Sequence, residues 1–558
     1  MDSFATSEEE TEQAQPVQRK SAKARAAATH PAKAAKIQKC NDAAAVLLTD
    51  FATSEEECHG DRPAAKQPAA QKKMHKKPAA KEMHKKPAAK ECRQERQVQR
   101  KPEFTRAEPA RMSIPTPKTM PSTSGAFDFA RWAVSQLTPT EAAALVQESE
   151  LTIGSVCSGQ STETLAMEAI MRCVPGCRGA LTFLCELDAR KRKHLQKLHP
   201  AAIILQDVAE LSADHVTDAR GKIQDKPRVK ILFAGISCKG LSGMNKNPES
   251  VLGSGSTGTT LRGLLDYVRS LPHEDRPRII ILENVANMAK QRRVEHDQVA
   301  AQIVSDLFAK LGYIANWDTF NSMDYFHPQC RDRLWMVFWR RPTLECTLAA
   351  HAKFAQVLHR VMAIAIRLQT GRHESLAVLM DRMGSSVSRA TVARESNDIT
   401  EKAKKENDAF MQKHNVVINA QTNAKFTALV RGLVSKRAAN VCLLKLAQVQ
   451  KQHGWKWEED LLVATVSQSV NWISVACDSF PTLLPSGPFL VFRHGKPFQA
   501  SGRLALAVQG VQLAELSFLK LADLPEALQQ DFAGNAFSSN VCIALLLATL
   551  VGCSEVLG

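Results

Sequence analysis

The stretch I-L-F-A-G-I-S-C-K-G-L-S-G, residues 231–243, is the part of this sequence that says most about the fold. Its apolar start predicts a buried strand, and the three glycines around Cys238 predict that the strand ends in a turn. In α/β proteins such turns lie at the sheet edge where ligands bind. We therefore expect Cys238 at a ligand-binding edge, beside Lys239, whose charge would favour a thiolate. The alternative is that Cys238 is a small hydrophobic core residue.

Similar apolar runs lie on both sides of this stretch and alternate with segments that have helical spacing. The runs that we expect to form buried strands are residues 151–156, 181–185, 202–205, 229–233, 278–282 and 334–339. The segments with helical spacing include residues 131–147, 162–172 and 299–311. This alternation predicts an α/β fold with a doubly wound, mostly parallel sheet.

Three of the predicted strands end in residues suited to a nucleotide-like ligand. The first leads into a Gly/Ser-rich turn, S-V-C-S-G-Q-S-T-E-T (residues 155–164), which can present backbone N–H groups. The second ends in C-E-L-D, with Glu186 and Asp188, and the third ends at Asp207. Carboxylates at this edge commonly accept hydrogen bonds from ribose hydroxyls. Together the three ends predict an adenosine-binding rim, although each acid alone could cap a helix.

Further polar residues are expected near Cys238. The strand R-I-I-I-L-E-N-V, residues 278–285, places Glu283 at the same edge, and a cysteine and a glutamate at neighbouring strand ends are an uncommon pair. Arg331 and Arg333 are two residues apart, so on a strand their side chains point the same way. The alternative for the two arginines is a surface salt-bridge pair.

The composition restricts the class of protein. The chain has 558 residues, a formal net charge of +16 and a pI of about 9.2, which suggests several structural units and favours a polyanionic partner. Its 14 cysteines include no C-x-x-C pair, so we expect reduced thiols and neither a zinc site nor a disulfide framework. The apolar stretch 541–553 is short of the ~20 residues that a membrane span requires. We expect a soluble intracellular protein.

The first part of the chain, residues 1–125, is rich in Ala, Lys and Pro and poor in large apolar residues, which predicts a disordered basic tail and linker. F-A-T-S-E-E-E occurs at residues 4–10 and 51–57, and M-H-K-K-P-A-A-K-E occurs at residues 74–82 and 83–91. The lysines of such a tail can neutralise phosphates without reading base sequence. The alternative is a passive, solubilising extension.

Taken in order, the motifs resemble those of the cytosine carbon-5 DNA methyltransferase family over residues 151–340 and 480–550. The turn 155–164, C-E-L-D and Q-D-V resemble the first three family motifs, A-G-I-S-C-K-G-L-S resembles the catalytic Pro-Cys-Gln loop, and L-E-N-V resembles the Glu-Asn-Val motif. H-P-Q-C-R-D-R-L-W (327–335) resembles the Gln-x-Arg-x-Arg strand, R-L-A-L-A-V-Q-G (503–510) is a faint version of the segment that supports the recognition domain, and A-G-N-A-F-S-S-N-V (533–541) resembles the helix start that closes the cofactor pocket.

The sequence departs from the family pattern at three places. Ser237 and Lys239 stand where the catalytic loop has proline and glutamine. In the first motif, Ser161 replaces the second glycine and Cys157 replaces the aromatic residue that faces the cofactor. Leu187 stands where a large ring often stacks on adenine.

The resemblance implies a division into a catalytic domain over residues 126–340, a target-recognition region over residues 341–480 and a return to the catalytic domain over residues 481–558. It implies S-adenosylmethionine as cofactor, no metal, and double-stranded DNA as partner, with the target cytosine flipped out of the helix. It also implies a nuclear location and leaves the oligomeric state open.

The implied roles fall on residues that match the family motifs. Cys238 would attack carbon 6 of cytosine, Glu283 would meet the charge that builds on N3, and the arginines would hold the cytosine O2 and orient the nucleophile loop. The catalytic residues are Cys238, Glu283, Arg331 and Arg333. The cofactor-binding residues are Cys157, Ser158, Gly159, Gln160, Glu186, Leu187, Asp207, Gly235, Ser237, Leu261, Asn535 and Ala536.

Two other functions stay open at this point. The same chemistry could act on cytosine in tRNA, which makes RNA the alternative partner. The chain could also be a catalytically inactive protein that binds DNA or chromatin, and the departures at Ser161, Ser237 and Lys239 favour that alternative.

Overall fold

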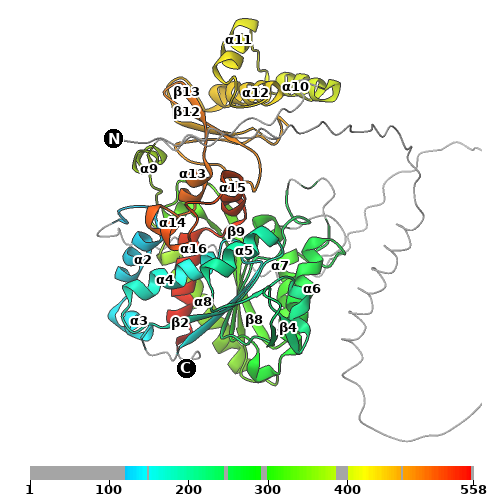
Figure 1. Cartoon of the computed structure of the whole chain (residues 1–558), viewed down its shortest axis with the longest axis vertical. Coiled ribbons are helices and arrows are strands. Elements are labelled where there is room, and N and C mark those ends of the chain that lie inside the picture. Colours follow the sequence, from blue (N-terminus) through cyan, green and yellow to red (C-terminus); the bar gives the residue numbers. More distant parts are fainter. Residues whose placement is uncertain are drawn as a thin grey trace, which may run out of the picture. The chain divides into compact units, whose positions relative to one another are not determined.

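The structure is a computed structural model that describes residues 120–146, 150–243, 245, 249–290, 298–384, 400–466 and 469–554 (Figure 1). The two repeats and most of the predicted tail lie outside the described residues. Among the described helices, none is by itself long and apolar enough to span a membrane, while one pair, Glu526–Asn535 and Ser539–Gly552, bent by 42°, meets the length and composition criteria together.

Seven strands form the main sheet in the order β3-β2-β1-β6-β7-β9-β8. They are β1 (Leu151–Val156), β2 (Gly179–Cys185), β3 (Ile203–Leu205), β6 (Ile231–Ala234), β7 (Ile279–Val285), β8 (Tyr313–Asn321) and β9 (Asp332–Arg340). Only β9 runs antiparallel to its neighbours, β7 and β8. The predicted doubly wound, mostly parallel sheet is confirmed. The sequence does not predict β8, because Y-I-A-N-W-D-T-F-N has no continuous apolar run and its side chains are only partly buried.

Helices cover both faces of this sheet, because successive side chains of a strand point to opposite faces. Ile279 and Ile281 pack into one cluster with α2, α4, α8 and α16, whereas Ile280 and Leu282 pack into another with α6 and α7. These helices are α2 (Ala126–Ser135), α4 (Thr162–Cys173), α6 (Ser256–Ser270), α7 (Ala300–Lys310), α8 (Leu348–Arg367) and α16 (Ser539–Gly552). Every residue of α16 is buried, so this helix lies at the centre of its layer.

Shorter elements connect these layers. They are α3 (Pro139–Ala144), α5 (Ala189–Leu198), η1 (Val208–Ser212), β4 (His215–Thr217), β5 (Ile223–Asp225), η2 (His273–Asp275), η3 (Ala286–Ala289), η4 (Ser322–Tyr325), α9 (Leu376–Met383), α13 (Gly502–Ala507), α14 (Leu513–Phe518) and α15 (Glu526–Asn535).

The single helix expected over residues 131–147 is wrong. The structure has α2 and then α3, which begins at Pro139. Thr138 accepts a hydrogen bond from the backbone of Glu141, and the Glu141 side chain accepts one from the Thr138 N–H, which forms a capping box. A capping box with proline at the first helical position starts a new helix.

A second group of elements forms what we call the small lobe, residues 401–499. It contains α10 (Glu401–His414), α11 (Ala420–Leu429), α12 (Lys436–His453) and an antiparallel sheet in the order β11-β10-β12-β13. The strands are β10 (Leu462–Thr465), β11 (Val475–Cys477), β12 (Phe489–Arg493) and β13 (Lys496–Gln499). Phe426, Trp457 and Phe492 pack together between helices and sheet. The sequence predicts a helix-rich region here and misses the sheet.

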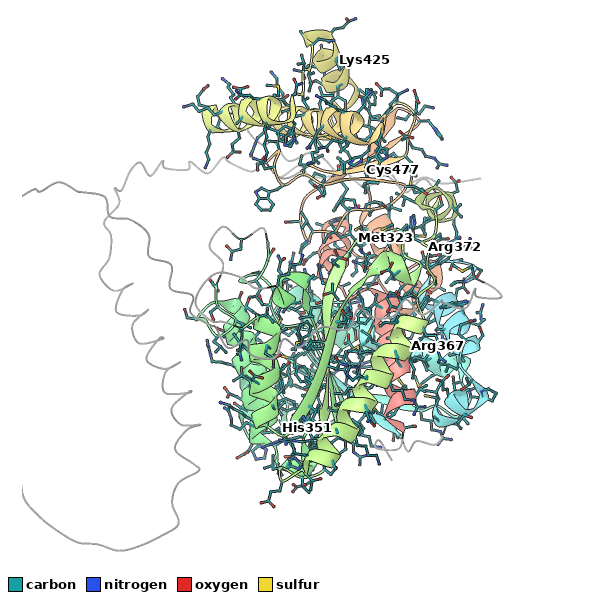
Figure 2. All side chains as sticks on the ribbon, turned by 180° about the vertical axis from the view of Figure 1, so that it is seen from behind. Met323, His351, Arg367, Arg372, Lys425 and Cys477 are labelled. Carbon is teal, nitrogen blue, oxygen red and sulfur yellow. The ribbon has the colours of Figure 1, made fainter. Side chains whose placement is uncertain are left out.

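Several elements pack with a different part of the chain from the one to which the predicted domain boundaries assign them. Helix α8 lies in the predicted recognition region, yet it packs against β8 and α16 of the main core. Figure 2 shows α8, which carries His351 and Arg367, lying along the strands of the main sheet. Conversely, β12 and β13 fall in the predicted return to the catalytic domain, yet they pair within the small-lobe sheet.

Packing also begins before the predicted boundary at residue 126, because Pro121 and Ser124 are buried. The Ser124 N–H donates to Glu374 Oε2 at 3.0 Å, and Ser124 Oγ accepts from Gln512 Nε2 at 2.9 Å. Asn540 Nδ2 donates to the Ser124 carbonyl at 3.3 Å. We call residues 120–125 the clasp, since they join the regions of α9, α14 and α16.

Candidate functional site

The turn after β1 has a strained backbone. Cys157, Gly159 and Ser161 have φ of +58°, +54° and +67°. For residues other than glycine, such conformations cost of order 1–3 kcal/mol each and are concentrated at functional sites. Around Gly159 there is room, since a Cβ there would meet only the Asn535 carbonyl oxygen, at 3.8 Å.

Three polar residues of this turn, Ser158, Gln160 and Ser161, are buried, and the first two bear on ligand binding. Ser158 Oγ donates to the Ser155 carbonyl at 3.1 Å, so the serine holds the turn against the end of β1. Gln160 Nε2 donates to Thr162 Oγ1 at 3.2 Å, while the buried Gln160 Oε1 has no hydrogen-bond partner within the described chain. An unpaired buried acceptor is costly, which indicates that a ligand group can pair with it.

Glu186, after β2, reaches back to the same turn. Its Oε2 accepts from the Gly159 N–H and its Oε1 accepts from the Asp188 N–H, both at 2.9 Å. Burial, together with the negative charges of Glu186 and Asp207, raises the pKa of Cys157 to about 12. The three predicted strand ends therefore lie together.

The alternative that an acid at a strand end caps a helix applies to two of the three acids, Asp188 and Asp207. Asp188 accepts from the N–H groups of Arg190 and Lys191 at the start of α5, and Asp207 accepts from Ala209 at the start of η1. The Arg190 side chain lowers the pKa of Asp188 to about 2. Glu186 caps no described helix.

The end of α15 and the residues after it complete this half of the site. Asn535 is exposed and donates to Asp531 Oδ1 at 2.6 Å, and Ala536 is buried. The next residue, Phe537, is one that sequence reasoning missed. A Cβ on Gly235 would lie 3.0 Å from the Phe537 ring, so a larger residue there would have to push the ring by a few tenths of an ångström. An aromatic side chain directly after two predicted site residues is the signal that could have found it.

Two leucines of the predicted cofactor set lie in opposite environments. Leu187, beside Glu186, is 68% exposed and presents an apolar side chain at the rim. Leu261, on α6, is fully buried in the core, so in this structure it supports the site by packing and offers a ligand no surface.

The other half of the site surrounds Cys238, which is partly buried after β6. Burial raises the pKa of its thiol and the charge of Glu283 raises it further, while Arg333 and Arg331 lower it. The four predicted catalytic residues are therefore neighbours. Lys239, which was expected to favour the thiolate, is exposed, and the two arginines supply the opposing positive charge instead.

Glu283 and Arg333 form a largely enclosed ion pair. Arg333 Nε lies 3.0 Å from Glu283 Oε1, and the two side chains are 15% and 12% exposed. Glu283 lies opposite Trp335 in the β7–β9 ladder and Arg333 lies opposite Val285, so the pair is diagonal on one face of the sheet.

Arg331 has different partners. It precedes β9 and is buried, and its guanidinium donates to the carbonyl oxygens of Gly534, at 3.3 Å, and Ala536, at 2.9 Å. Burial lowers its pKa to about 9. In this structure Arg331 fastens the start of β9 to the segment after α15, and Arg333 is the arginine on the side of Glu283.

The loop that carries Cys238 is tied to the neighbouring strand and helix. Asn284 Nδ2 donates to the Ile236 carbonyl at 3.2 Å, and the Ser237 N–H donates to Thr260 Oγ1 at 3.2 Å. Within the described residues, no three His, Cys, Asp or Glu side chains are grouped so that they could hold a metal ion.

With this geometry in view, the comparison with known families is decisive. Residues 151–458 match the family described as C-5 cytosine-specific DNA methylase. The chain belongs to this family. The matched stretch of this C-5 cytosine-specific DNA methylase contains β1 to β9, Cys238, Glu283 and both arginines, and it ends within the small lobe.

Two curated methyltransferases are similar in sequence. DNA (cytosine-5-)-methyltransferase DMT5 of Cryptococcus neoformans var. grubii is 25% identical over 450 residues, which cover 73% of this chain and 17% of that protein. Type II methyltransferase M.HaeII of Haemophilus aegyptius is 30% identical over 115 residues, which cover 20% of this chain and 32% of that protein. The chain thus spans well under half the length of either relative.

Two solved methyltransferase structures are similar to this chain. The S. pombe Dnmt2 methyltransferase has a TM-score of 0.37 and 9% identity, and covers 72% of this chain and 98% of its own. The Entamoeba histolytica methyltransferase EhMeth has a TM-score of 0.36 and 10% identity, with the same coverage.

Proposed function

We propose that the chain transfers a methyl group from S-adenosylmethionine to carbon 5 of cytosine in DNA, through a covalent adduct on Cys238. One observation carries the proposal: in a member of the C-5 cytosine-specific DNA methylase family, Cys238 lies with Glu283 and Arg333 at the sheet edge that also carries the Gly159 turn. The DNA-methyltransferase name of one curated relative supports DNA as the substrate.

The residues of the first half site fit the cofactor. Leu187 offers exposed apolar surface for an adenine ring, and each Glu186 oxygen keeps a lone pair for a ribose hydroxyl beside the N–H that it already binds. The space over Gly159 and the unpaired Gln160 Oε1 leave room for polar groups. When bound, the cofactor supplies an electrophilic methyl group.

The second half site fits the activation of cytosine. The Cys238 thiolate adds to carbon 6, which forms an S–C bond and moves electron density to carbon 5. The proton that the Cys238 thiol gives up passes by way of Glu283 to N3 and neutralises the charge that builds there, and Arg333 keeps the Glu283 carboxyl group in place. After methylation, loss of the carbon 5 proton breaks the S–C bond and restores the thiolate. The ring face must be accessible, so the base is flipped out at a cost of a few kcal/mol.

Covalent trapping tests this proposal. On DNA with 5-fluorocytosine the fluorine cannot leave as a proton does, so wild-type protein and S-adenosylmethionine should give a covalent complex that Cys238→Ser does not give. Radiolabelled methyl transfer to DNA and to tRNA, measured in parallel, decides between the two substrates. A protein that binds cofactor and DNA but forms no adduct and labels neither nucleic acid is the inactive binding protein instead.

A further inference from the structure

We propose that three hydroxyl side chains at the start of α6, those of Ser256, Thr257 and Thr260, are positioning residues that hold the Cys238 loop in the way a proline otherwise would. Residues 228–247 contain no proline, so nothing in the covalent backbone fixes φ near the thiol. The catalytic meaning of this inference rests on the proposed function, whereas the positioning itself does not.

The backbone N–H groups on both sides of Cys238 donate to the same helix. The Ser237 N–H donates to Thr260 Oγ1 at 3.2 Å, and the Gly240 N–H donates to the buried Thr257 Oγ1 at 2.9 Å. A Cβ on Gly240 would lie 3.0 Å from that oxygen, so the backbone of Gly240 and the Thr257 side chain are closely packed. The segment that carries the thiol is thus fastened at both ends to one rigid element.

The hydroxyl groups are oriented for this task. Thr260 Oγ1 lies 2.9 Å from the Ser256 carbonyl and 3.0 Å from the Thr257 carbonyl, so its own proton is directed into the helix and its lone pairs remain for Ser237. Ser237 Oγ and Ser256 Oγ are 2.9 Å apart and form a second link. Alanine at any of these positions would remove one link.

The opposite side of the loop is held by backbone and amide groups. Asn284 Nδ2 binds the Ile236 carbonyl, and the N–H groups of Leu241 and Ser242 donate to the Cys238 carbonyl at 3.0 Å and 2.9 Å. These bonds shape the turn but do not attach it to α6. Only the hydroxyl groups join the loop to the helix within this set of contacts, so we expect the loop to be sensitive to their removal.

The first experiment measures how fast iodoacetamide alkylates Cys238 in the full chain without DNA, by peptide mass spectrometry. Loss of one neutral hydrogen bond, worth roughly 1 kcal/mol, should let the half-buried thiol open about fivefold more often, so Thr260→Ala should be alkylated about fivefold faster. Thr260→Ser keeps the hydroxyl and should match wild type. The matched control is Thr259→Ala, because Thr259 is exposed on the same turn and its hydroxyl bonds, among the described residues, to the Ser254 carbonyl and to Arg262.

The second experiment restores rigidity by other means. Ser237→Pro alone places a ring carbon where the N–H meets Thr260 Oγ1, so the two collide and alkylation should be fast. In Ser237→Pro/Thr260→Ala that oxygen is gone and the ring fixes φ, so alkylation should return to near the wild-type rate. The φ angle of Ser237 is not positive, so its sign is compatible with proline.

The outcomes separate this inference from the proposed function. Equal alkylation of Thr260→Ala, Thr259→Ala and wild type, or a double variant no slower than both single variants, overturns the positioning role. If the alkylation pattern holds while no variant transfers methyl groups, the positioning stands and the proposed function fails. If both hold, Thr260→Ala should lower kcat, by at most about fivefold because opening becomes about fivefold more frequent, and leave cofactor affinity within twofold of wild type.

Discussion

Cys238 lies between opposite charges. Burial and Glu283 raise the pKa of its thiol, and Arg333 and Arg331 act against that rise. At neutral pH the resting group is therefore the thiol. The signs of these effects can be measured one residue at a time.

Removing the Glu283 charge should lower the pKa of Cys238, so Glu283→Gln should be alkylated several-fold faster at pH 7.5. Arg333→Met removes a positive charge and should be slower. In wild type the rate should keep rising above the pH at which a free cysteine levels off. Equal pH profiles for the three proteins would show that these charges do not act on the thiol.

Glu163 is a second buried acid at this edge of the sheet. It is fully buried in the first turn of α4 and contacts Ser161 Oγ at 3.3 Å, and its Oε2 has no hydrogen-bond partner in the described chain. Burial raises its pKa from 4.5 to about 7. Because the folded-state pKa is raised, the stability that this carboxyl contributes is complete below pH 4.5 and is lost as the pH rises through about 7.

The glutamine in Glu163→Gln does not titrate. The free energy of unfolding of this variant should therefore rise relative to that of wild type as the pH rises from 5 to 8. We expect a gain of about 2–3 kcal/mol, measured by urea unfolding at both pH values. Glu168→Gln serves as control, because Glu168 lies on the same helix and pairs with Arg172 where both side chains reach solvent, and it should show no such trend. If the difference in free energy of unfolding between Glu163→Gln and wild type is the same at every pH, the pKa of Glu163 is not raised in the folded protein.

Among the elements, the clasp is the shortest piece that joins several others. A chain that begins at residue 126 leaves Glu374, Gln512 and Asn540 without the partners that Ser124 provides. Buried groups without partners cost about 1–3 kcal/mol each. We expect that chain to melt several degrees below one that begins at residue 120, by calorimetry, and Ser124→Ala to lose part of the same stability. Identical melting temperatures would mean that the clasp is not part of the folded core.

The elements also show what the sequence can and cannot predict. The sequence predicts β1 with the bounds that the structure has, and it predicts β7 from the apolar run 279–282, because strands buried on both faces are rich in such residues. β8 is partly exposed, and the small-lobe strands have three to five residues each, so neither has a distinctive local pattern. α8 was separated from the core because its amphipathic pattern does not say which surface it covers.

The same limit applies to the site. The strand ends at Glu186 and Asp207 and the cysteine turn follow from local sequence, since parallel strands bring their carboxyl ends to one edge. The partners of Arg331 could not be predicted, because Gly534 and Ala536 lie about 200 positions further along the chain. Local spacing placed both arginines on one side of a strand, whereas the fold gives them different neighbours.

At the scale of the whole molecule, the net charge of +16 predicts binding that depends on salt. If residues 1–119 contact phosphates through their Lys-Lys-Pro repeats, the full chain should show a steeper fall of log affinity with log salt than a chain that begins at residue 120. Each phosphate contact should add about 0.9 to the slope. The affinities can be measured by fluorescence anisotropy with duplex DNA. If the slope of log affinity against log salt is the same for both chains, residues 1–119 do not contact phosphates.

The central position of α16 has a consequence for biosynthesis. The strands of the main sheet are complete once the ribosome passes Arg340, but the helical layer over the face that includes Ile279 and Ile281 lacks its central helix, α16, until Gly552 has been made. At 5–20 residues per second, translation of the intervening chain takes roughly 10–40 s. During that time α2, α4 and α8 cover only part of a strongly apolar sheet face, and the rest is open to water and to other nascent chains, so in the cell this protein should depend on chaperones that shield such surfaces while synthesis continues.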